Sequence, residues 1–233
     1  MMALLVRSEL WPDHSALRAV PIEKVAKLMW FHHQASELVI WSDGRRVGHL
    51  KLEPKVGVDG DARTLEFSGN LQVRLPGSPR HRISWDGKVT FDENFHPDGL
   101  TLGLDMKDVS NDRAEIRVTR VDNRAHFRVL NVQGIELESS EYSLDERGLK
   151  KLLAQVDLDP SLIDAMRSPA TAAPTVTAQE SSLVVHHERT KTYLTEVRQG
   201  GQTLLEAHVN ELGQVIRVKS LVGYSLAPDD LLP

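Results

Sequence analysis

The sequence predicts a mainly β fold of the α+β class, a strongly curved antiparallel sheet or incomplete β-barrel with helices over its concave face. Three observations predict it. Apolar and polar residues alternate over most of the 233 residues, short turn sequences separate the alternating stretches, and helical spacing is confined to three short segments. In HRISWDGKVTFD, residues 81–92, Ile83, Trp85, Val89 and Phe91 all fall on odd positions. Successive side chains of a strand point to opposite faces, so this stretch has one apolar and one polar face.

The first half of the chain predicts one helix followed by a meander. Apolar residues recur at helical spacing over 21–33, and Pro21 suits a first helical turn because its missing N–H costs nothing there. Asp43-Gly44 is a strong hairpin signal because both residues tolerate positive φ. Eight alternating stretches with turn-length links are expected to be consecutive antiparallel strands: residues 37–42, 46–53, 64–75, 81–92, 100–106, 113–120, 124–132 and 135–138.

The next segment is helical. Ser143-Leu-Asp-Glu146 matches a capping box, in which the serine hydroxyl accepts from the third amide of the helix and the glutamate reaches back. The buried stripe of this helix is expected to be Leu149, Leu152, Leu153 and Val156. Asp159-Pro160 predicts a second short helix over 161–166.

The last part of the chain predicts four further strands, over 183–188, 192–198, 202–209 and 214–220. They follow SPATAAPTVTAQESS, residues 168–182, which is small, polar and proline-bearing and is typical of a flexible surface loop.

About twelve strands exceed the ~10 that an open twisted sheet tolerates before it curls or splits. We therefore expect a flexible N-terminal arm over 1–19, a single β-rich domain over 20–228 that contains the loop 168–182, and a tail over 229–233. A β-sandwich is the alternative. Two domains divided at the loop would leave four short strands with a marginal core.

The composition excludes several classes of protein. Apolar residues make up 40% and charged residues 26%, the net charge is −5, and no basic block is present, so a nucleic acid is not the expected partner. The absence of cysteine excludes disulfides, thiolate nucleophiles and zinc–thiolate sites. No apolar run approaches the ~20 residues of a membrane-spanning helix. Met1-Met2 is either an ordinary start or the place where a signal or membrane anchor was removed.

No catalytic, metal or cofactor site is expected. The ten histidines form neither His-x-His nor His-Glu-x-x-His, and the neighbours His186-His187 would point to opposite faces of a predicted strand. The acidic loop over 92–99 has Pro97 where a calcium-binding EF-hand needs glycine. No Gly-x-Ser-x-Gly elbow occurs either.

The apolar face of the sheet is the candidate site. We expect a ligand to contact seven large side chains on it: Trp41, Phe67, Ile83, Trp85, Phe91, Leu102 and Phe127. Half-buried sheets always carry such a stripe, so an ordinary packed core explains it as well. A lipid-sized cavity between sheet and helices is the other explanation, because ligand pockets are mostly apolar and open at the mouths of curved β structures.

The order of one helix, a strand meander, further helices and a few returning strands resembles that of Lol-type lipoprotein carriers of the bacterial envelope. The closing GGQTLLEAHVNELGQVIRVKSLVGY, residues 200–224, is also similar to the last strands of β-rich envelope proteins, some of which precede transglutaminase-like domains. The resemblance implies an open half-barrel that holds acyl chains and is lidded by helices. It also implies a periplasmic or envelope location. No lipobox cysteine and no transglutaminase triad is present.

The predicted function is therefore a non-enzymatic envelope protein that binds a lipid or acyl chain in a β cup and needs no cofactor. The alternative is an interaction or accessory module with a filled core, which docks an envelope protein and holds no small ligand. A cytoplasmic location is the alternative to the envelope.

Overall fold

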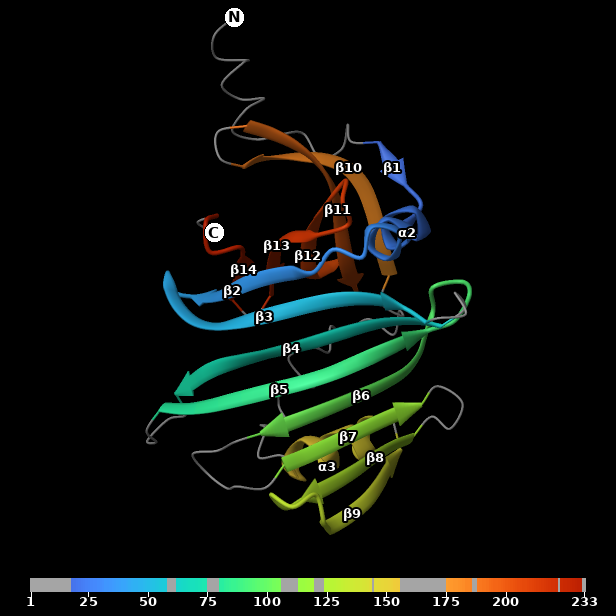
Figure 1. Cartoon of the computed structure of the whole chain (residues 1–233), viewed down its shortest axis with the longest axis vertical. Helices are drawn as coiled ribbons and strands as arrows, with labels where there is room; N and C mark the ends of the chain where they lie inside the picture. The colour runs from blue at the N-terminus through green and yellow to red at the C-terminus, as the bar shows by residue number, and fades with distance from the viewer. Residues whose placement is uncertain are drawn as a thin grey trace, which may run out of the picture.

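The computed structural model describes residues 18–57, 62–74, 80–105, 113–119, 124–143, 145–155, 175–185, 188–221 and 223–231. Within these ranges the chain forms one antiparallel sheet of 14 strands and two helices (Figure 1). The strand order is β1-β10-β11-β12-β13-β14-β2-β3-β4-β5-β6-β7-β8-β9, so β1 and β9 are the two edges and the sheet does not close. This confirms the prediction of a curved antiparallel sheet or incomplete barrel.

The predicted meander is present in full. Each of its eight strands pairs with the next: β2 (Ser36–Ser42), β3 (Arg45–Val56), β4 (Arg63–Arg74), β5 (Arg80–Phe91), β6 (Pro97–Asp105), β7 (Arg113–Thr119), β8 (Arg124–Leu130) and β9 (Glu136–Ser143). Figure 1 shows β4 to β9 as a broad twisted layer, with β10 and β11 crossing the view beside α2.

Of the six other strands, β1 precedes the meander in the chain and the remaining five follow it. They are β1 (Ala19–Val20), β10 (Thr175–Val185), β11 (Glu188–Gln199), β12 (Gln202–Asn210), β13 (Val215–Ser220) and β14 (Tyr224–Ala227). β1 and β14 were not predicted, because two and four residues are too few to show alternation. β14 is nevertheless what joins the two halves into one sheet, since it pairs with both β13 and β2.

The loop predicted over 168–182 is wrong for its second half. Residues 175–182 lie in β10, which pairs along its whole length with β11. Thr175, Val176 and Thr177 are β-branched and fit a pleated sheet, although the small residues around them are typical of loops. Ala19 lies in β1, so the arm predicted over 1–19 does not extend through that residue. His186, His187 and 156–174, with the helix expected at 161–166, lie outside the described residues, and the division into arm, domain and tail stays a prediction.

Three glycines lie on a diagonal across the centre of the apolar face, which we define as the face that carries Phe67 and Trp85. Gly48 pairs with Leu71, Gly69 with Trp85 and Gly87 with Phe67. From one strand to the next, the glycine moves by two residues along the strand, which is one position on the same face. A Cβ atom at each would collide with a backbone oxygen of the neighbouring strand. Glycine is therefore required at these three positions, where the neighbouring strands approach too closely for a side chain, as is typical of a bent sheet.

Two aromatic rings cover two of these glycines. Trp85 Cζ2 lies 2.7 Å from the position that a Cβ of Gly69 would take, and Phe67 Cζ lies 2.6 Å from that of Gly87. Each ring therefore lies against its cross-strand partner, where it replaces the packing that glycine lacks.

The apolar face contains two buried clusters. The first lies under α2 (Ile22–His32) and consists of Val25, Leu38, Ala178, Tyr193, Val209, Val215 and Val218. The second consists of Ile116, Ala125 and Phe127 in β7 and β8, behind which Figure 1 shows α3 (Glu146–Gln155). The prediction that helices cover the concave face is thus confirmed.

The helix ends differ in detail from the prediction. Pro21 is the N-cap of α2 and not a residue of its first turn. The N-terminal cap of α3 is Asp145, whose Oδ1 accepts from the Gly148 amide at 2.7 Å, while Ser143 Oγ accepts from the Asp145 amide at 3.3 Å. The predicted Ser143–Glu146 capping box is wrong because Ser143 is still the last residue of β9. The side chains of the stripe predicted for α3 lie outside the described residues.

Replacing Gly69 by alanine tests the bend. Because the added methyl group would displace the Trp85 ring and the neighbouring backbone, we expect Gly69→Ala to lower the free energy of unfolding by about 2 kcal/mol. The neighbouring Ser68→Ala, at an exposed position on the other face, is the control and is expected to change it by less than about 0.5 kcal/mol. Urea denaturation of both variants measures the difference, and equal stabilities would contradict the role of the glycine.

The Asp145 cap makes the start of α3 sensitive to pH. The Gly148 amide is the largest cause that holds the pKa of the Asp145 carboxyl below its ordinary 3.8, and Ser143 and Arg147 act in the same direction. A pKa lowered by folding adds stability above pH 3.8, and this is lost as the pH falls through the lower folded value. We expect Asp145→Asn to speed hydrogen exchange of the Gly148 amide several-fold at neutral pH and to reduce the acid dependence of that exchange. An unchanged exchange rate would contradict the cap.

Candidate functional site

The candidate site is the middle of the apolar face, where β4 and β5 lie between the two buried clusters. Neither cluster of described residues, nor the apolar side chains packed against them, includes an apolar residue of these two strands. The side chains are only half-buried although they point to the concave side: Leu65, Phe67, Leu71, Ile83, Trp85 and Val89. Among the described residues, the two ends of the apolar face are thus filled by packing, while the side chains in its middle stay only half-buried.

Four of the seven predicted site residues share this face between the clusters. Phe67, Ile83 and Trp85 lie on β4 and β5, and Leu102 on β6 pairs with Gly87 beside them. Leu102 also packs against the second cluster, so it forms the border of the open stretch. Phe127 lies in the same row of cross-strand pairs but is only 1% exposed and belongs to that cluster. A ligand in the open stretch would not reach it.

Phe91 is covered by the protein itself. The Trp30 ring of α2 meets it edge-on, with 4.9 Å between the centroids, and Trp30 Nε1 donates to the Thr64 carbonyl at 3.3 Å. This end of the apolar face is therefore closed by the helix. The sequence contained the signal in Trp30-Phe31, but which strand end the helix meets depends on the fold.

Trp41 lies on the opposite face, which corrects the prediction. It follows Ile40 directly in β2 and pairs with Arg46 and Ser225, whereas Ile40 pairs with Gly48 on the apolar face. Leu38, Val39 and Ile40 are all buried. Alternation cannot assign faces in such a strand, because both of its faces are apolar.

A wide hollow of about 940 Å³ opens beside α2 at the strand ends. Its apolar wall includes Leu28, Trp30, Val56 and Phe95, and its rim carries Lys24, Lys27 and Arg63. The Arg63 guanidinium lies 4.6 Å from the Phe95 ring centroid, and Phe31 is 78% exposed. The hollow contains apolar surface and charges of both signs, because Glu23 and Glu93 also line it.

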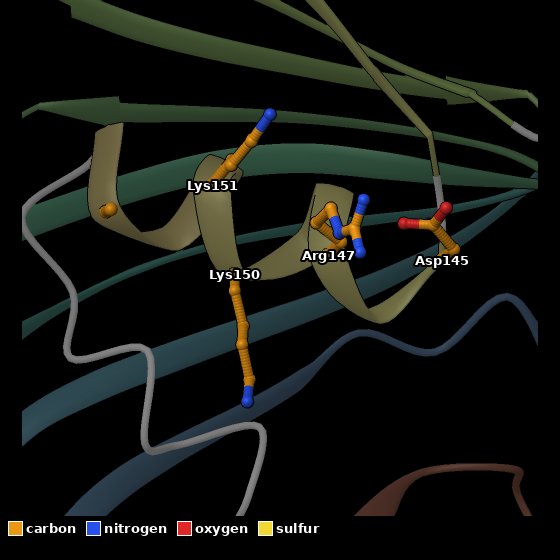
Figure 2. Close-up of a pocket in the computed structure, with 5 residues that line it drawn as sticks. Asp145, Arg147, Lys150 and Lys151 are labelled. Atoms are coloured by element: carbon orange, nitrogen blue, oxygen red, sulfur yellow. The ribbon is translucent and has the colours of Figure 1, made fainter.

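A second open hollow, of about 680 Å³, lies along α3. Arg147, Lys150, Lys151 and Ala154 line it and are spaced three or four residues apart, so they share one side of the helix. In Figure 2 Arg147 lies next to Asp145, and the two lysines extend from α3 in different directions. Within the described residues neither Arg147 nor Lys151 forms an ion pair, and like charges at this spacing repel each other.

Two cations on the polar face of the sheet are paired instead. Arg113 Nη2 lies 2.7 Å from Asp86 and its Nη1 lies 2.8 Å from Asp105. Lys55 Nζ lies 2.6 Å from Glu66 across β3 and β4. Arg147 and Lys151 therefore differ from these two residues in forming no ion pair within the described part of the chain, although Arg147 lies near enough to lower the pKa of Asp145.

The described residues contain no group of three or more histidines and carboxylates that could hold a metal ion. The acidic loop is an ordinary turn, in which Asp92 Oδ1 accepts from the amides of Asn94 at 2.9 Å and His96 at 2.8 Å. These bonds, that of His96 above all, lower the pKa of Asp92. Neither described helix is long and apolar enough to cross a membrane.

No family model matches the sequence, and the comparison with curated proteins finds no significant match. Among solved structures, the chain is similar to the crystal structure of a β-barrel-like protein of the domain of unknown function DUF1849 from Brucella abortus. The two share 9% identity with a TM-score of 0.40, over 83% of this chain and 92% of that chain. A likeness this distant carries no argument about function and does not single out Lol-type carriers. The chain's own strand pairing is what establishes a barrel-like antiparallel fold.

Proposed function

We propose that the protein binds an amphiphile whose apolar chain lies on β4 and β5 and whose acidic head lies at α3. The observation that carries this proposal is the set of half-buried apolar side chains between two filled clusters. Apolar surface that stays open on a concave face is typical of ligand sites, because such sites are mostly apolar with a few polar groups that orient the ligand.

The basic side of α3 supports an acidic head group. Arg147, Lys150 and Lys151 line one hollow together with Asp145, and the excess of positive charge there favours an anion. A carboxylate or phosphate is the group that such cations bind best. An apolar strip and a basic stripe together fit a fatty acid or a phospholipid better than they fit a neutral oil.

A second candidate function is docking of a partner protein at the β9 edge. Three large apolar side chains are exposed where β8 turns into β9: Val132 at 76%, Ile135 at 56% and Leu137 at 58%. Asn131 Oδ1 accepts from the Gln133 and Ile135 amides, both at 2.9 Å, so the turn that presents them is ordered. Ordered apolar side chains in water at a free sheet edge favour an interaction surface.

An envelope location and the absence of catalysis stay predictions that the geometry does not test. Fractionation of the native host's cells, with an antibody against the protein, distinguishes the periplasm and membranes from the cytoplasm.

Tryptophan quenching tests the apolar chain site. We expect 9,10-dibromostearate to quench the protein's emission saturably, because bromine quenches at short range and Trp85 lies on the open stretch. Trp85→Phe is expected to remove most of the quenching. Trp41→Phe is the matched control and is expected to keep it, because Trp41 lies on the other face. Quenching that does not saturate, or that Trp85→Phe leaves intact, would contradict the proposal.

Charge removal on α3 tests the head group separately. We expect the triple variant Arg147→Gln, Lys150→Gln and Lys151→Gln to bind dodecanoate about tenfold more weakly, because charge-assisted bonds are lost, and dodecanol as before. A matched triple variant on the polar face, Lys51→Gln, Arg82→Gln and Lys88→Gln, loses the same charge and is expected to bind both like the unchanged chain. Calorimetric titration measures the affinities, and equal losses in both triples would exclude a local role of α3.

A further inference from the structure

A third hollow, of about 320 Å³, lies on the polar face of β11, β12 and β13. Two rows of directly paired residues form it. Leu194, His208 and Arg217 make one row, and Glu196, Glu206 and Lys219 make the next. Leu194 is 3% exposed and provides an apolar patch among charged walls. This hollow is separate from the apolar face, because the residues of both rows point to the opposite side of the sheet.

The hollow contains a buried donor that nothing accepts from. Arg217 Nε is shielded from solvent and has no hydrogen-bond partner. Leaving a buried donor of a charged group unpaired is costly, so such groups in native proteins have an acceptor in the protein, in an ordered water or in a bound molecule.

The charged and polar neighbours of Arg217 do not accept a hydrogen bond from its Nε atom. Glu196 is held by Arg198 at 3.0 Å. Thr192 Oγ1 lies 3.2 Å from His208 Nδ1 and fixes that ring. Glu206 forms no ion pair with Arg217 or Lys219 in the described part of the chain, although it lies next to both in the sheet. Within the described part of the chain, the same hollow thus holds a half-buried arginine and a half-buried carboxylate that are not paired with each other or with another charge.

We propose that this hollow binds a small zwitterion of the amino-acid class. Its carboxylate accepts from the Arg217 guanidinium, its ammonium group donates to Glu206, and an apolar side chain contacts Leu194. Each charged group of the ligand then meets the protein group that lacks a partner. A hollow of 320 Å³ is at the lower end of ligand pockets, which suits a molecule of this size.

Calorimetric titration with three matched probes tests the site. L-leucine carries both charged groups, 4-methylpentanoate lacks the ammonium and isopentylamine lacks the carboxylate. We expect L-leucine to bind saturably and each truncated probe to bind at least tenfold more weakly. Arg217→Met is expected to weaken L-leucine binding at least tenfold. Glu206→Gln is expected to weaken L-leucine but not 4-methylpentanoate.

The exposed Arg45→Met is the control for the loss of one arginine and is expected to bind L-leucine like the unchanged chain. Thermal unfolding of each variant establishes that it is folded before it is titrated. Three results would overturn the proposal. They are the absence of saturable binding of L-leucine, equal binding by folded Arg217→Met, and inorganic phosphate binding as tightly as L-leucine, which would mark a simple anion site. None of these results depends on whether an amphiphile binds the other face.

Discussion

The bend of β3, β4 and β5 toward their apolar face is the constraint on which the rest of the structure depends. It requires Gly48, Gly69 and Gly87 on one diagonal, because a Cβ at each would collide with the neighbouring backbone. The Trp85 and Phe67 rings cover two of these positions and restore the lost packing. Without the bend the apolar side chains would lie on a flat surface instead of a concave one.

Much of the fold could be predicted from the sequence, because one-sided alternation over stretches such as 81–92 has a single structural meaning. The alternation failed at Trp41, where Leu38, Val39 and Ile40 are buried on both faces. It also failed at β14, whose four residues are recognised as a strand only through their partners. In β10 the prolines and small residues nearby predicted a loop in spite of the β-branched residues. Pairing with β11 makes this segment a strand.

The candidate sites were less predictable, since they depend on cross-strand register. The predicted residues of β4, β5 and β6 share a face because of local alternation, but Phe91 is covered by Trp30 of the distant helix α2 and Phe127 is buried with Ile116 and Ala125 of β7 and β8. The hollow with Arg217 could not be predicted at all. Its two rows depend on irregularities of pairing at Val197 and His208, and nothing in the chain marks where a register shifts.

The dimensions of the described elements explain why the two described helices leave part of the apolar face without a helix over it. β4 has 12 residues and is about 40 Å long, and the seven strands from β3 to β9 span about 29 Å. α2 and α3, with 11 and 10 residues, are about 16 and 15 Å long and about 10 Å wide. Two such helices cover less than half of that area, so each closes one end. Because open apolar surface is unfavourable in water, an apolar ligand on β4 and β5 would stabilise the bent sheet that binds it.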